Sequence, residues 1–196
     1  GGPVMEMSKE YYYHKLYELA AMLNSSHAPD TVLQAFVEGV AKALGAKGCS
    51  LLLLSPDRKN LVHTISYGLS ARYVKKGQVS ADKSIAQALD GQAVSILDAT
   101  TDERVQFPRE NKEEGIASIL SVPMMQRGDI VGVVRVYTTE PHEFSADDTY
   151  FVWAAANLGA IALENARLYD SIAKDYEALK RDVAEWGLRI GGGGGM

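Results

Sequence analysis

Hydrophobic and polar residues follow two different periods along the chain, and each period predicts its own kind of element. Apolar residues recur every three or four positions over 5–24 and over 29–44, which is typical of amphipathic helices. Pro29 suits the first turn of the second helix, and Gly45 suits its end. The first 45 residues are therefore predicted to form a pair of helices.

Shorter apolar runs rich in β-forming residues follow this pair. The runs at 48–55 and 60–67 are joined by the turn-forming letters PDRKN, so they predict a β-hairpin. Residues 68–78 are predicted to form a loop. The remaining elements predicted for the middle region are a short helix at 84–90, a brief strand at 92–97 and a short helix at 109–114.

A second hairpin is predicted over residues 115–137, where two β-rich runs flank the turn QRGD at 126–129. Gly128 can take the positive φ angle that such a tight turn requires. Successive residues of a strand point to opposite sides, so the second strand has two chemically different faces. One face carries Gly132, Val134 and Val136, and the other carries Val133, Arg135 and Tyr137.

The last third of the chain predicts one long helix, from Ser145 to Trp186. Ser145 followed by Asp148 is typical of a capping box, and no proline interrupts the pattern. A helix of about 42 residues is roughly 63 Å long, because each residue adds about 1.5 Å. A compact domain of about 150 residues has a diameter of roughly 38 Å. We therefore expect about a third of this helix to project from the domain.

Apolar residues step by three and four along the whole of this helix, which predicts a coiled-coil seam with Asn165 as a polar residue that sets its register. Two arrangements would cover the seam: packing on the chain's own N-terminal helix, or a parallel homodimer with a four-helix bundle. A long unsupported helix is marginal in water, which favours the homodimer. The residues predicted for this surface are Leu16, Leu23, Leu158, Ile161, Asn165, Leu168 and Ile172.

Composition limits the classes of partner. The chain has 196 residues, of which 46% are hydrophobic and 23% charged, as expected for one globular domain with an appendage. A net charge of −5 gives no basic footprint for nucleic acid or for an anionic membrane surface. Cys49 is the single cysteine, so neither an intrachain disulfide nor a thiolate zinc cluster can form.

No signal peptide or membrane span is visible in the sequence. The N-terminal letters GGPVMEM lack the basic start and apolar core of a signal peptide. The longest uncharged run, 149–163, is shorter than the roughly 20 residues that span a membrane. With a single cysteine as well, we expect a cytoplasmic protein.

Five segments in this order resemble the GAF domain, a sensory relative of the PAS fold, over about residues 28–170. No one segment is specific by itself, but their order is. The segments are ISYGLS at 65–70, DKSIAQALDGQAVSILDATTDERVQ at 82–106, GIASILSVPM at 115–124, IVGVVRVYTTEPHEFSADD at 130–148 and LGAIALENARLYD at 158–170.

The resemblance implies an α+β fold, with an antiparallel sheet of five or six strands. N- and C-terminal helices would cover one face of the sheet, and loops and short helices would form a ligand pocket on the other. The Val134 face of the second hairpin would then carry the helices, and the Arg135 face would look into the pocket. The resemblance implies these pocket residues: Tyr67, Tyr73, Ile85, Asp98, Arg104, Phe107, Ser118 and Arg135.

Arg135 is the most specific of these candidates, because it is a charged residue within an apolar strand. A guanidinium within an apolar strand must be paired or solvated. It could bind a carboxylate or phosphate ligand through two parallel hydrogen bonds, or it could pair internally with Asp98 or a nearby Glu. Internal pairing or solvation is the favoured interpretation.

The motifs by which GAF domains bind their known ligands are incomplete or missing in this sequence. Cyclic-nucleotide-binding GAF domains are similar in carrying an Asn-Lys pair and a Phe-x3-Asp-Glu motif, of which Phe144 and Asp148 are present here. A covalent bilin needs a cysteine in the pocket, whereas Cys49 begins a predicted strand. The GAF enzymes that reduce methionine sulfoxide use several cysteines. His63 could reach the pocket as a haem ligand, although a hydrogen-bonded strand histidine is the more ordinary interpretation.

No nucleophile elbow, phosphate-binding glycine loop or HExxH motif is present, so we expect no catalysis. The sequence predicts a small-molecule sensor, and the alternative is a structural dimerisation module with a degenerate pocket. Neither the ligand nor a cofactor is identified, and an output domain or kinase-like partner would receive the signal. The predicted parts are an N-terminal helix at 1–27, the sensor domain at 28–170, a signalling helix at 171–188 and a flexible tail at 189–196.

Overall fold

The computed structural model describes residues 8–24, 28–81 and 86–191, with side chains as far as residue 183. A six-stranded antiparallel sheet lies at its centre, in the order β3-β2-β1-β6-β5-β4. The strands are β1 Gly48–Leu54, β2 Asn60–Tyr67, β3 Val79–Ser80, β4 Val94–Ile96, β5 Ser118–Gln126 and β6 Asp129–Thr138. The predicted α+β architecture is confirmed.

The predicted turn between β5 and β6 has the geometry of a tight hairpin. Arg127 has a φ angle of 51° and Gly128 one of 90°, so both central residues are left-handed, as a type I′ turn requires. Gly132 follows on β6, where an added Cβ would lie 2.2 Å from the carbonyl oxygen of Leu52. This glycine therefore permits the close approach of β1 and β6.

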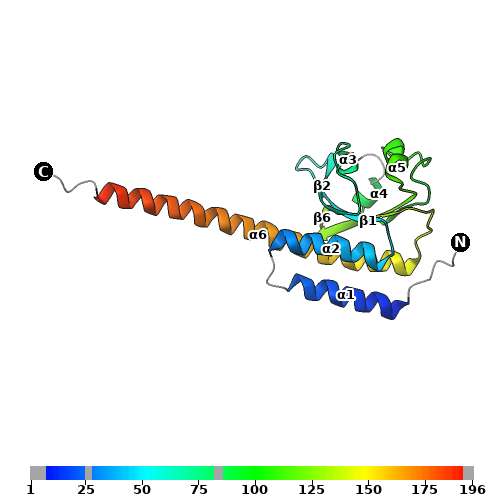
Figure 1. Cartoon of the computed structure of the whole chain (residues 1–196), viewed down its shortest axis with the longest axis horizontal. Helices are drawn as coiled ribbons and strands as arrows, with labels where there is room; N and C mark the ends of the chain where they lie inside the picture. The colour runs from blue at the N-terminus through cyan, green and yellow to red at the C-terminus, as the bar shows by residue number, and fades with distance from the viewer. Residues whose placement is uncertain (1–7, 25–27, 82–85, 192–196) are drawn as a thin grey trace.

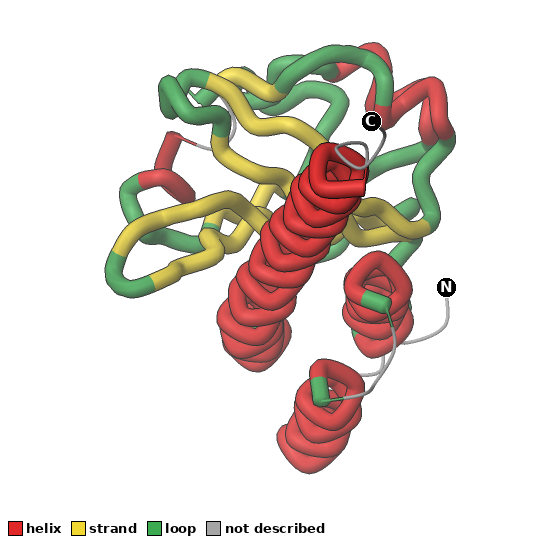
Figure 2. The backbone as a smooth tube through the Cα atoms, turned by 90° about the vertical axis from the view of Figure 1, so that its left-hand side faces the viewer, coloured by secondary structure: helices red, strands yellow, loops and turns green. Residues whose placement is uncertain are grey.

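Three long helices cover one face of the sheet, which we call the helix face (Figures 1 and 2). They are α1 Lys9–Leu23, α2 Pro29–Ala43 and α6 Ala146–Gly191. In Figure 2, α6 lies directly against the sheet, with the two other helices beside it and farther out. Three short helices and the loops between them lie on the opposite side, which we call the loop face: α3 Ala71–Val74, α4 Ala86–Leu89 and α5 Pro108–Glu114. The stretch predicted as a loop at 68–78 thus contains a short helix.

The sheet separates two hydrophobic cores. On the helix face, Val134 and Val136 pack among apolar residues of α1, α2 and α6, including the fully buried Phe36. On the loop face, Val133 and Tyr137 pack in a second cluster with residues of the short elements. The two predicted faces of β6 are therefore confirmed.

A β-bulge on β2 changes which of its side chains reach the loop face. Leu51 pairs with Ile65 and Leu52 pairs with His63, so Thr64 is the extra residue. His63 lies opposite Leu52 of the loop-face core, whereas Ile65 packs with the helix-face core. Strict alternation would place His63 and Ile65 on one side of the sheet, but the bulge turns them to opposite sides.

The start of α6 forms the predicted capping box. The Asp148 backbone N–H donates to Ser145 Oγ at 3.1 Å, and the Ser145 N–H donates back to the Asp148 carboxylate at 2.9 Å. The same carboxylate accepts a hydrogen bond from the hydroxyl of Tyr12 on α1 and lies 3.3 Å from Nε2 of His142. The cap therefore also fastens the N-terminal helix to the C-terminal one.

Helix α6 has a packed part and a projecting part (Figure 1). Buried residues occur along it as far as Ala166, and the residues described beyond that point are largely exposed. The remaining 25 residues, 167–191, extend for about 37 Å at roughly 1.5 Å per residue. Within the part of the chain that the structure describes, no helix is long and apolar enough to cross a membrane.

Candidate functional site

Arg135 is the charged side chain at the centre of the loop face. It lies on β6 between Ser50 of β1 and Ser121 of β5, and only 4% of its surface is exposed. Its Nε donates a hydrogen bond to Ser121 Oγ at 3.0 Å. The strand register thus supplies hydroxyl groups on both sides of a buried guanidinium, which lowers the cost of removing it from water.

Two buried tyrosines extend this polar cluster. The Tyr137 hydroxyl lies 2.8 Å from Ser50 Oγ. The Tyr73 hydroxyl of α3 donates to Asn111 Oδ1 of α5 at 2.7 Å, and the Asn111 amide donates to the Ala99 carbonyl at 2.9 Å. The rings of Tyr73 and Tyr137 meet edge to face, with centroids 5.9 Å apart. Tyr73 therefore joins α3 and α5 to the sheet.

Lys76 lies two residues beyond the end of α3, and its side chain folds back over the Tyr73 ring. Its Nζ is 3.5 Å from the ring centroid and 5.4 Å from that of Phe107. The same Nζ donates to the Tyr73 carbonyl at 3.3 Å and lies 3.5 Å from Nε2 of His63. The other ring nitrogen of His63 is buried and has no hydrogen-bond partner among the described residues.

Burial and mutual repulsion weaken the charges of this cluster. Burial lowers the pKa of His63 to about 3, and the positive charges of Lys76 and Arg135 contribute. Burial and the charge of Arg135 lower the pKa of Lys76 to about 7, against an opposing effect of Glu110 and Glu114. Near neutral pH, His63 is uncharged and Lys76 exists in both protonation states.

Two spaces adjoin Tyr73 and Lys76. The inner void has a volume of about 10 Å³, room for about one water molecule. It is lined by Tyr73, Lys76, Val79, Val105, Gln106, Phe107, Asn111, Ile119 and Arg135. The surface hollow has a volume of about 630 Å³ and opens to solvent between α3 and α5. It is lined by Ser70, Arg72, Tyr73, Lys75, Lys76, Arg109, Glu110, Glu113 and Glu114.

Three of the predicted pocket residues come together at this cluster. Tyr73, Phe107 and Arg135 all line the inner void. Tyr73 is fully buried and Phe107 half-buried, so both are part of the loop-face core as well.

Two predicted pocket residues lie on the helix face instead. Tyr67 pairs with Cys49 and packs against the helix-face core, because the bulge at Thr64 reverses the facing of this end of β2. Ser118 lies two residues before Leu120, which is on the helix face, and it is fully buried. Its hydroxyl donates to the Leu97 carbonyl at 2.6 Å and accepts from the His142 N–H at 2.8 Å. The pocket prediction is wrong for both residues.

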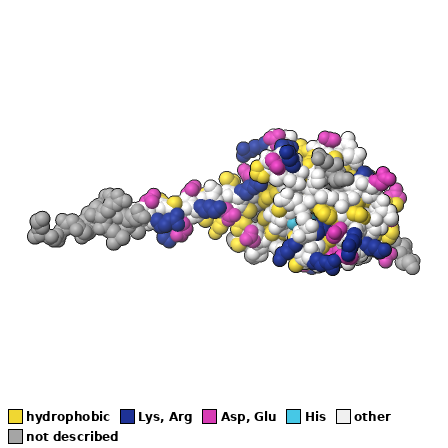
Figure 3. Space-filling view, turned by 90° about the horizontal axis from the view of Figure 1, so that it is seen from above, with side chains coloured by type: hydrophobic (Ala, Val, Ile, Leu, Met, Phe, Trp, Pro, Cys, Tyr) yellow, Lys and Arg dark blue, Asp and Glu magenta, His cyan; other side chains and the backbone are white. Residues whose placement is uncertain are grey.

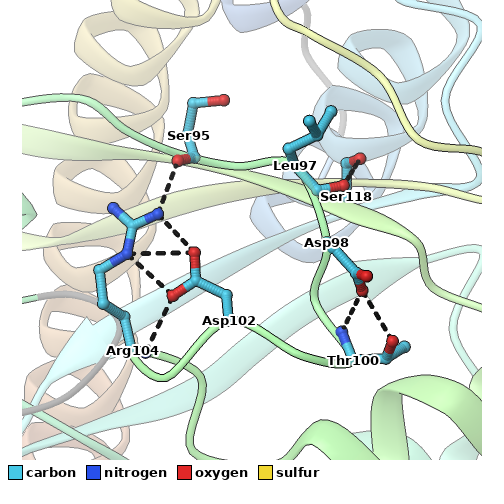
Figure 4. A network of polar contacts seen from close by, with 7 residues as sticks. All are labelled: Ser95, Leu97, Asp98, Thr100, Asp102, Arg104 and Ser118. Atoms are coloured by element: carbon cyan, nitrogen blue, oxygen red, sulfur yellow. Dashed lines mark hydrogen bonds and ion pairs between the residues drawn. The ribbon is translucent and has the colours of Figure 1, made fainter.

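Two more predicted residues stabilise a surface loop (Figure 4). The Asp98 carboxylate accepts hydrogen bonds from the backbone N–H and the hydroxyl of Thr100, at 2.8 and 2.7 Å. Arg104 forms an ion pair with Asp102 at 2.6 Å and donates to the Ser95 carbonyl at 3.3 Å. Both side chains are exposed, and neither lines the inner void or the surface hollow. Ile85 lies outside the described residues.

The sequence patterns did not single out Lys76, Asn111, Ser50 or Ser121. The two serines could have been found from the strand register, since each is the direct neighbour of Arg135. Lys76 follows Tyr73 by three residues, the spacing that places two side chains on one side of a helical turn. That signal is visible only once a helix, and not a loop, is assigned to 71–74.

Other chemistry has little support within the described residues. Cys49 is fully buried at the start of β1, and burial raises the pKa of its thiol, so it is not a ready nucleophile. No group of three His, Cys, Asp or Glu side chains in the described part of the chain could hold a metal ion.

The family model described as "GAF domain" matches residues 26–164 of this chain. No curated protein matches it. Among solved structures, it is similar to the GAF domain of a phosphoenolpyruvate-protein phosphotransferase from Coxiella burnetii, with a TM-score of 0.74 and 20% identity over 84% of this chain and 99% of that one. The GAF domain of the corresponding Acinetobacter protein has a TM-score of 0.69 and 23% identity, over 83% and 97%.

An enzyme shares the fold as well. Free methionine-R-sulfoxide reductase from Neisseria meningitidis, solved with its substrate, has a TM-score of 0.68 and 16% identity, over 84% of this chain and 96% of that one. At these identities the likeness concerns the fold, and the chemistry of each site must be argued from its own residues.

Proposed function

Because this chain belongs to the GAF domain family, we propose that it is a non-enzymatic module that senses a small molecule on the loop face and relays the ligand state through its terminal helices. One observation carries the proposal. Strand β6 has Arg135 and Tyr137 in a buried polar cluster on one side, and Val134 and Val136 against the helices on the other. A ligand that displaces β6 would therefore move the surface on which α6 rests.

Relay requires two states with different affinities for the ligand. The contact of the Tyr12 hydroxyl with the Asp148 cap joins α1 to the first turn of α6, so the two terminal helices would move together. Beyond Ala166 the motion would be carried by α6 itself, toward an output domain or a kinase-like partner.

We propose that the exposed apolar surface of the terminal helices is the interface of a parallel homodimer. Apolar and charged side chains are interleaved along the projecting part of α6 (Figure 3). A helix of this length is marginal alone in water, and its apolar positions follow a coiled-coil spacing. Among the side chains that the structure describes, the large apolar residues exposed on α6 are Tyr150, Ile161, Leu168, Tyr169, Ile172, Tyr176, Leu179 and Val183. Asn165 is exposed among them, and α1 adds Tyr13 and Tyr17. Leu16, Leu23 and Leu158 are half-buried in the domain's own helix-face core.

The ligand proposal is tested by a thermal-shift screen of small carboxylates, phosphates and neutral compounds against the parent, Arg135→Ala and Arg135→Gln. The Gln variant keeps much of the side-chain volume in case Ala prevents folding. Arg127→Asn is the matched control, because it removes a guanidinium from the exposed turn of the same hairpin and Asn tolerates a positive φ. We expect hits whose shift is lost in the Arg135 variants alone. Hits unaffected by Arg135, or no hit at all, would contradict the proposal.

The dimer is tested by sedimentation equilibrium of the full chain. Ile172→Glu places a charge on the proposed seam and should weaken association by at least about tenfold, or roughly 1.4 kcal/mol. Lys174→Glu is the control, because residue 174 lies two residues after Ile172 and therefore on the opposite side of α6. A parent that sediments as a monomer would remove the interface from the proposal.

A second candidate function has its own supporting observation. The inner void holds about one water molecule, far below the few hundred Å³ of an ordinary ligand pocket. A structural dimerisation module whose loop face is filled by its own side chains would look like this. Native mass spectrometry of the purified chain separates the two, since a co-purified small molecule favours the sensor and a bare chain favours the dimerisation module.

A further inference from the structure

We propose that Lys76 is a reactive amine that captures small aldehydes carrying an anionic group from the surface hollow, as a reversible imine. The inference names a ligand class for the loop face and rests on the proposed sensing function for its biological meaning.

Lys76 lies where the surface hollow meets the inner void. Together with Tyr73 it lines both spaces, so its half-buried side chain borders the open hollow on one side and the protein interior on the other. The Tyr73 ring covers Nζ at 3.5 Å, and the Phe107 ring lies 5.4 Å away. Aromatic surface cannot replace the water lost by an ammonium group in full, although the ring faces attract the cation.

Among the residues that the structure describes, the charged and titratable groups around the amine come from four elements. Arg135 on β6 repels the ammonium form, and Glu110 and Glu114 on α5 attract it. His63 on β2 is uncharged near neutral pH, and Tyr73 on α3 is too, because burial raises its pKa. The balance lowers the pKa of Lys76 to about 7, so at pH 7.5 most of this amine is neutral. An ordinary lysine, with a pKa near 10.4, is neutral in only about one molecule in a thousand at that pH.

A neutral amine in contact with a carbonyl compound forms an imine without an oxidant or a reductant. The Nζ lone pair attacks the carbonyl carbon, and the C=O π bond breaks to give a carbinolamine, with proton transfer from nitrogen to oxygen. Loss of the hydroxyl group as water, with the second amine proton, leaves R–N=CH–R′. The overall change is R–NH2 + R′–CHO → R–N=CH–R′ + H2O, so hydrolysis by water reverses it.

The surroundings favour an aldehyde that also carries an anion. Imine formation removes the positive charge of Lys76 from the edge of the hollow. The rim of the hollow carries Arg72, Lys75 and Arg109 beside three glutamates. Arg72 and Arg109 share the carboxylate of Glu113, Glu114 also pairs with Lys47, and Lys75 is exposed. A carboxylate or phosphate placed near these groups would be stabilised at short range. The hollow, at about 630 Å³, is within the usual range for small-molecule sites.

The test uses the full-length chain with two aldehydes that differ by one phosphate, pyridoxal 5′-phosphate and pyridoxal. Each is added at an equimolar amount, the imine is trapped with borohydride, and the modified lysine is located by peptide mass spectrometry. We expect labelling at Lys76 about tenfold or more above that at Lys75, its exposed neighbour on the same hollow. The phosphate compound should react several-fold more than pyridoxal. The rate at Lys76 should reach half its maximum near pH 7.

Three variants separate a reactive amine from a merely accessible one. Lys76→Met should remove the trapped label, and Lys75→Met should keep it. Arg135→Gln should shift the pH profile of Lys76 to higher pH, because it removes a charge that lowers the pKa of this amine, an effect that a simple loss of structure would not produce. Circular dichroism of each variant shows whether it is folded.

Equal labelling of Lys75 and Lys76, or a Lys76 profile with an ordinary lysine midpoint, would overturn the proposal. Equal reaction of pyridoxal and pyridoxal 5′-phosphate would overturn its anionic part. The outcome is distinct from that of the sensing proposal. An unlabelled Lys76 together with hits that depend on Arg135 leaves a non-covalent sensor, whereas labelling without such hits leaves the amine chemistry alone.

Discussion

The two faces of the sheet are built from different chemistry, although β6 contributes to both. On the helix face, Val134 and Val136 meet a core of aliphatic and aromatic side chains from three helices. On the loop face, Arg135 and Tyr137 of the same strand lie in a polar cluster of hydroxyl, amide, imidazole and ammonium groups. Adjacent residues of one strand therefore serve two purposes.

The free energy of folding and the specificity of this domain are expected to lie on different faces of the sheet. Apolar packing on the helix face depends on volume and tolerates replacement by residues of similar size. Each buried polar group on the loop face needs a particular partner, and losing one partner leaves the other unsatisfied. We expect large effects on stability from the helix face, and smaller effects coupled to binding or to pH from the loop face.

The largest effect is expected from Phe36→Ala on α2. Phe36 is fully buried, and a Cβ added at Gly159 of α6 would lie 3.1 Å from its ring, so the ring fills the space between the two helices. Its removal should lower the free energy of unfolding by about 3–5 kcal/mol, measured by urea denaturation. Phe36→Leu is the control and should cost clearly less. A loss below about 1 kcal/mol for the alanine variant would mean that the helix face is loosely packed.

Asp148→Asn tests the polar exception on the helix side. Burial raises the pKa of this carboxyl, but hydrogen bonds from Tyr12, Ser145 and His142 outweigh burial and hold it below its usual value. The carboxylate thus stabilises the fold above a pH of about 4, and this contribution disappears as the pH falls through the lowered pKa. The variant should lose about 2 kcal/mol at pH 7 and little at low pH.

The measurement for this prediction is urea denaturation at pH 7 and at the lowest pH where both proteins are folded. Tyr12→Phe removes one of the donors and should give a smaller loss with the same pH trend. Equal destabilisation of the Asn variant at both values of pH would show that the charge of Asp148 contributes nothing.

Tyr137→Phe tests polar pairing on the loop face. The substitution leaves Ser50, which is fully buried, without its partner at 2.8 Å, and should cost about 1–2 kcal/mol. Ser50→Ala in the same background should restore part of the loss, because neither partner is then left unsatisfied. A double-mutant cycle from urea denaturation gives the coupling energy of Tyr137 and Ser50. Strictly additive losses would show that their contact contributes no stability.

Hydrophobic periodicity was sufficient for most of the fold. The two long helix patterns, both hairpins and the capping box of α6 follow from local residue preferences, and they appear within a few residues of their predicted bounds. The two faces of β6 were also predictable, because successive side chains of a regular strand point to opposite faces of the sheet.

The candidate site was only partly predictable, because two of its determinants are not local. The bulge at Thr64 reverses the end of β2, so Tyr67 packs against the helices and His63 takes the place on the loop face. Asp98 was a plausible partner for a buried guanidinium, but the nearby Thr100 supplies its hydrogen bonds. No property of the single residues distinguishes these outcomes, since each depends on pairing between strands or on loop geometry.

The smallest effect is expected from Lys76→Met, and its dependence on pH is the sharpest contrast between the two faces. The pKa of Lys76 falls from an ordinary value near 10.4 in the unfolded chain to about 7 in the folded one. The unfolded chain therefore binds more protons between these values, and stability rises with pH across this range. Below pH 7 the folded protein holds a desolvated ammonium, and the variant removes that cost but also loses the contact with the Tyr73 ring.

For Lys76→Met we expect a net gain in the free energy of unfolding of about 1 kcal/mol at pH 6, and this gain should shrink as the pH approaches 10. The measurement is urea denaturation, with Lys75→Met as the control. The apolar substitutions on the helix face should show no such trend, so a gain for Lys76→Met that is constant with pH would place Lys76 with the ordinary surface lysines.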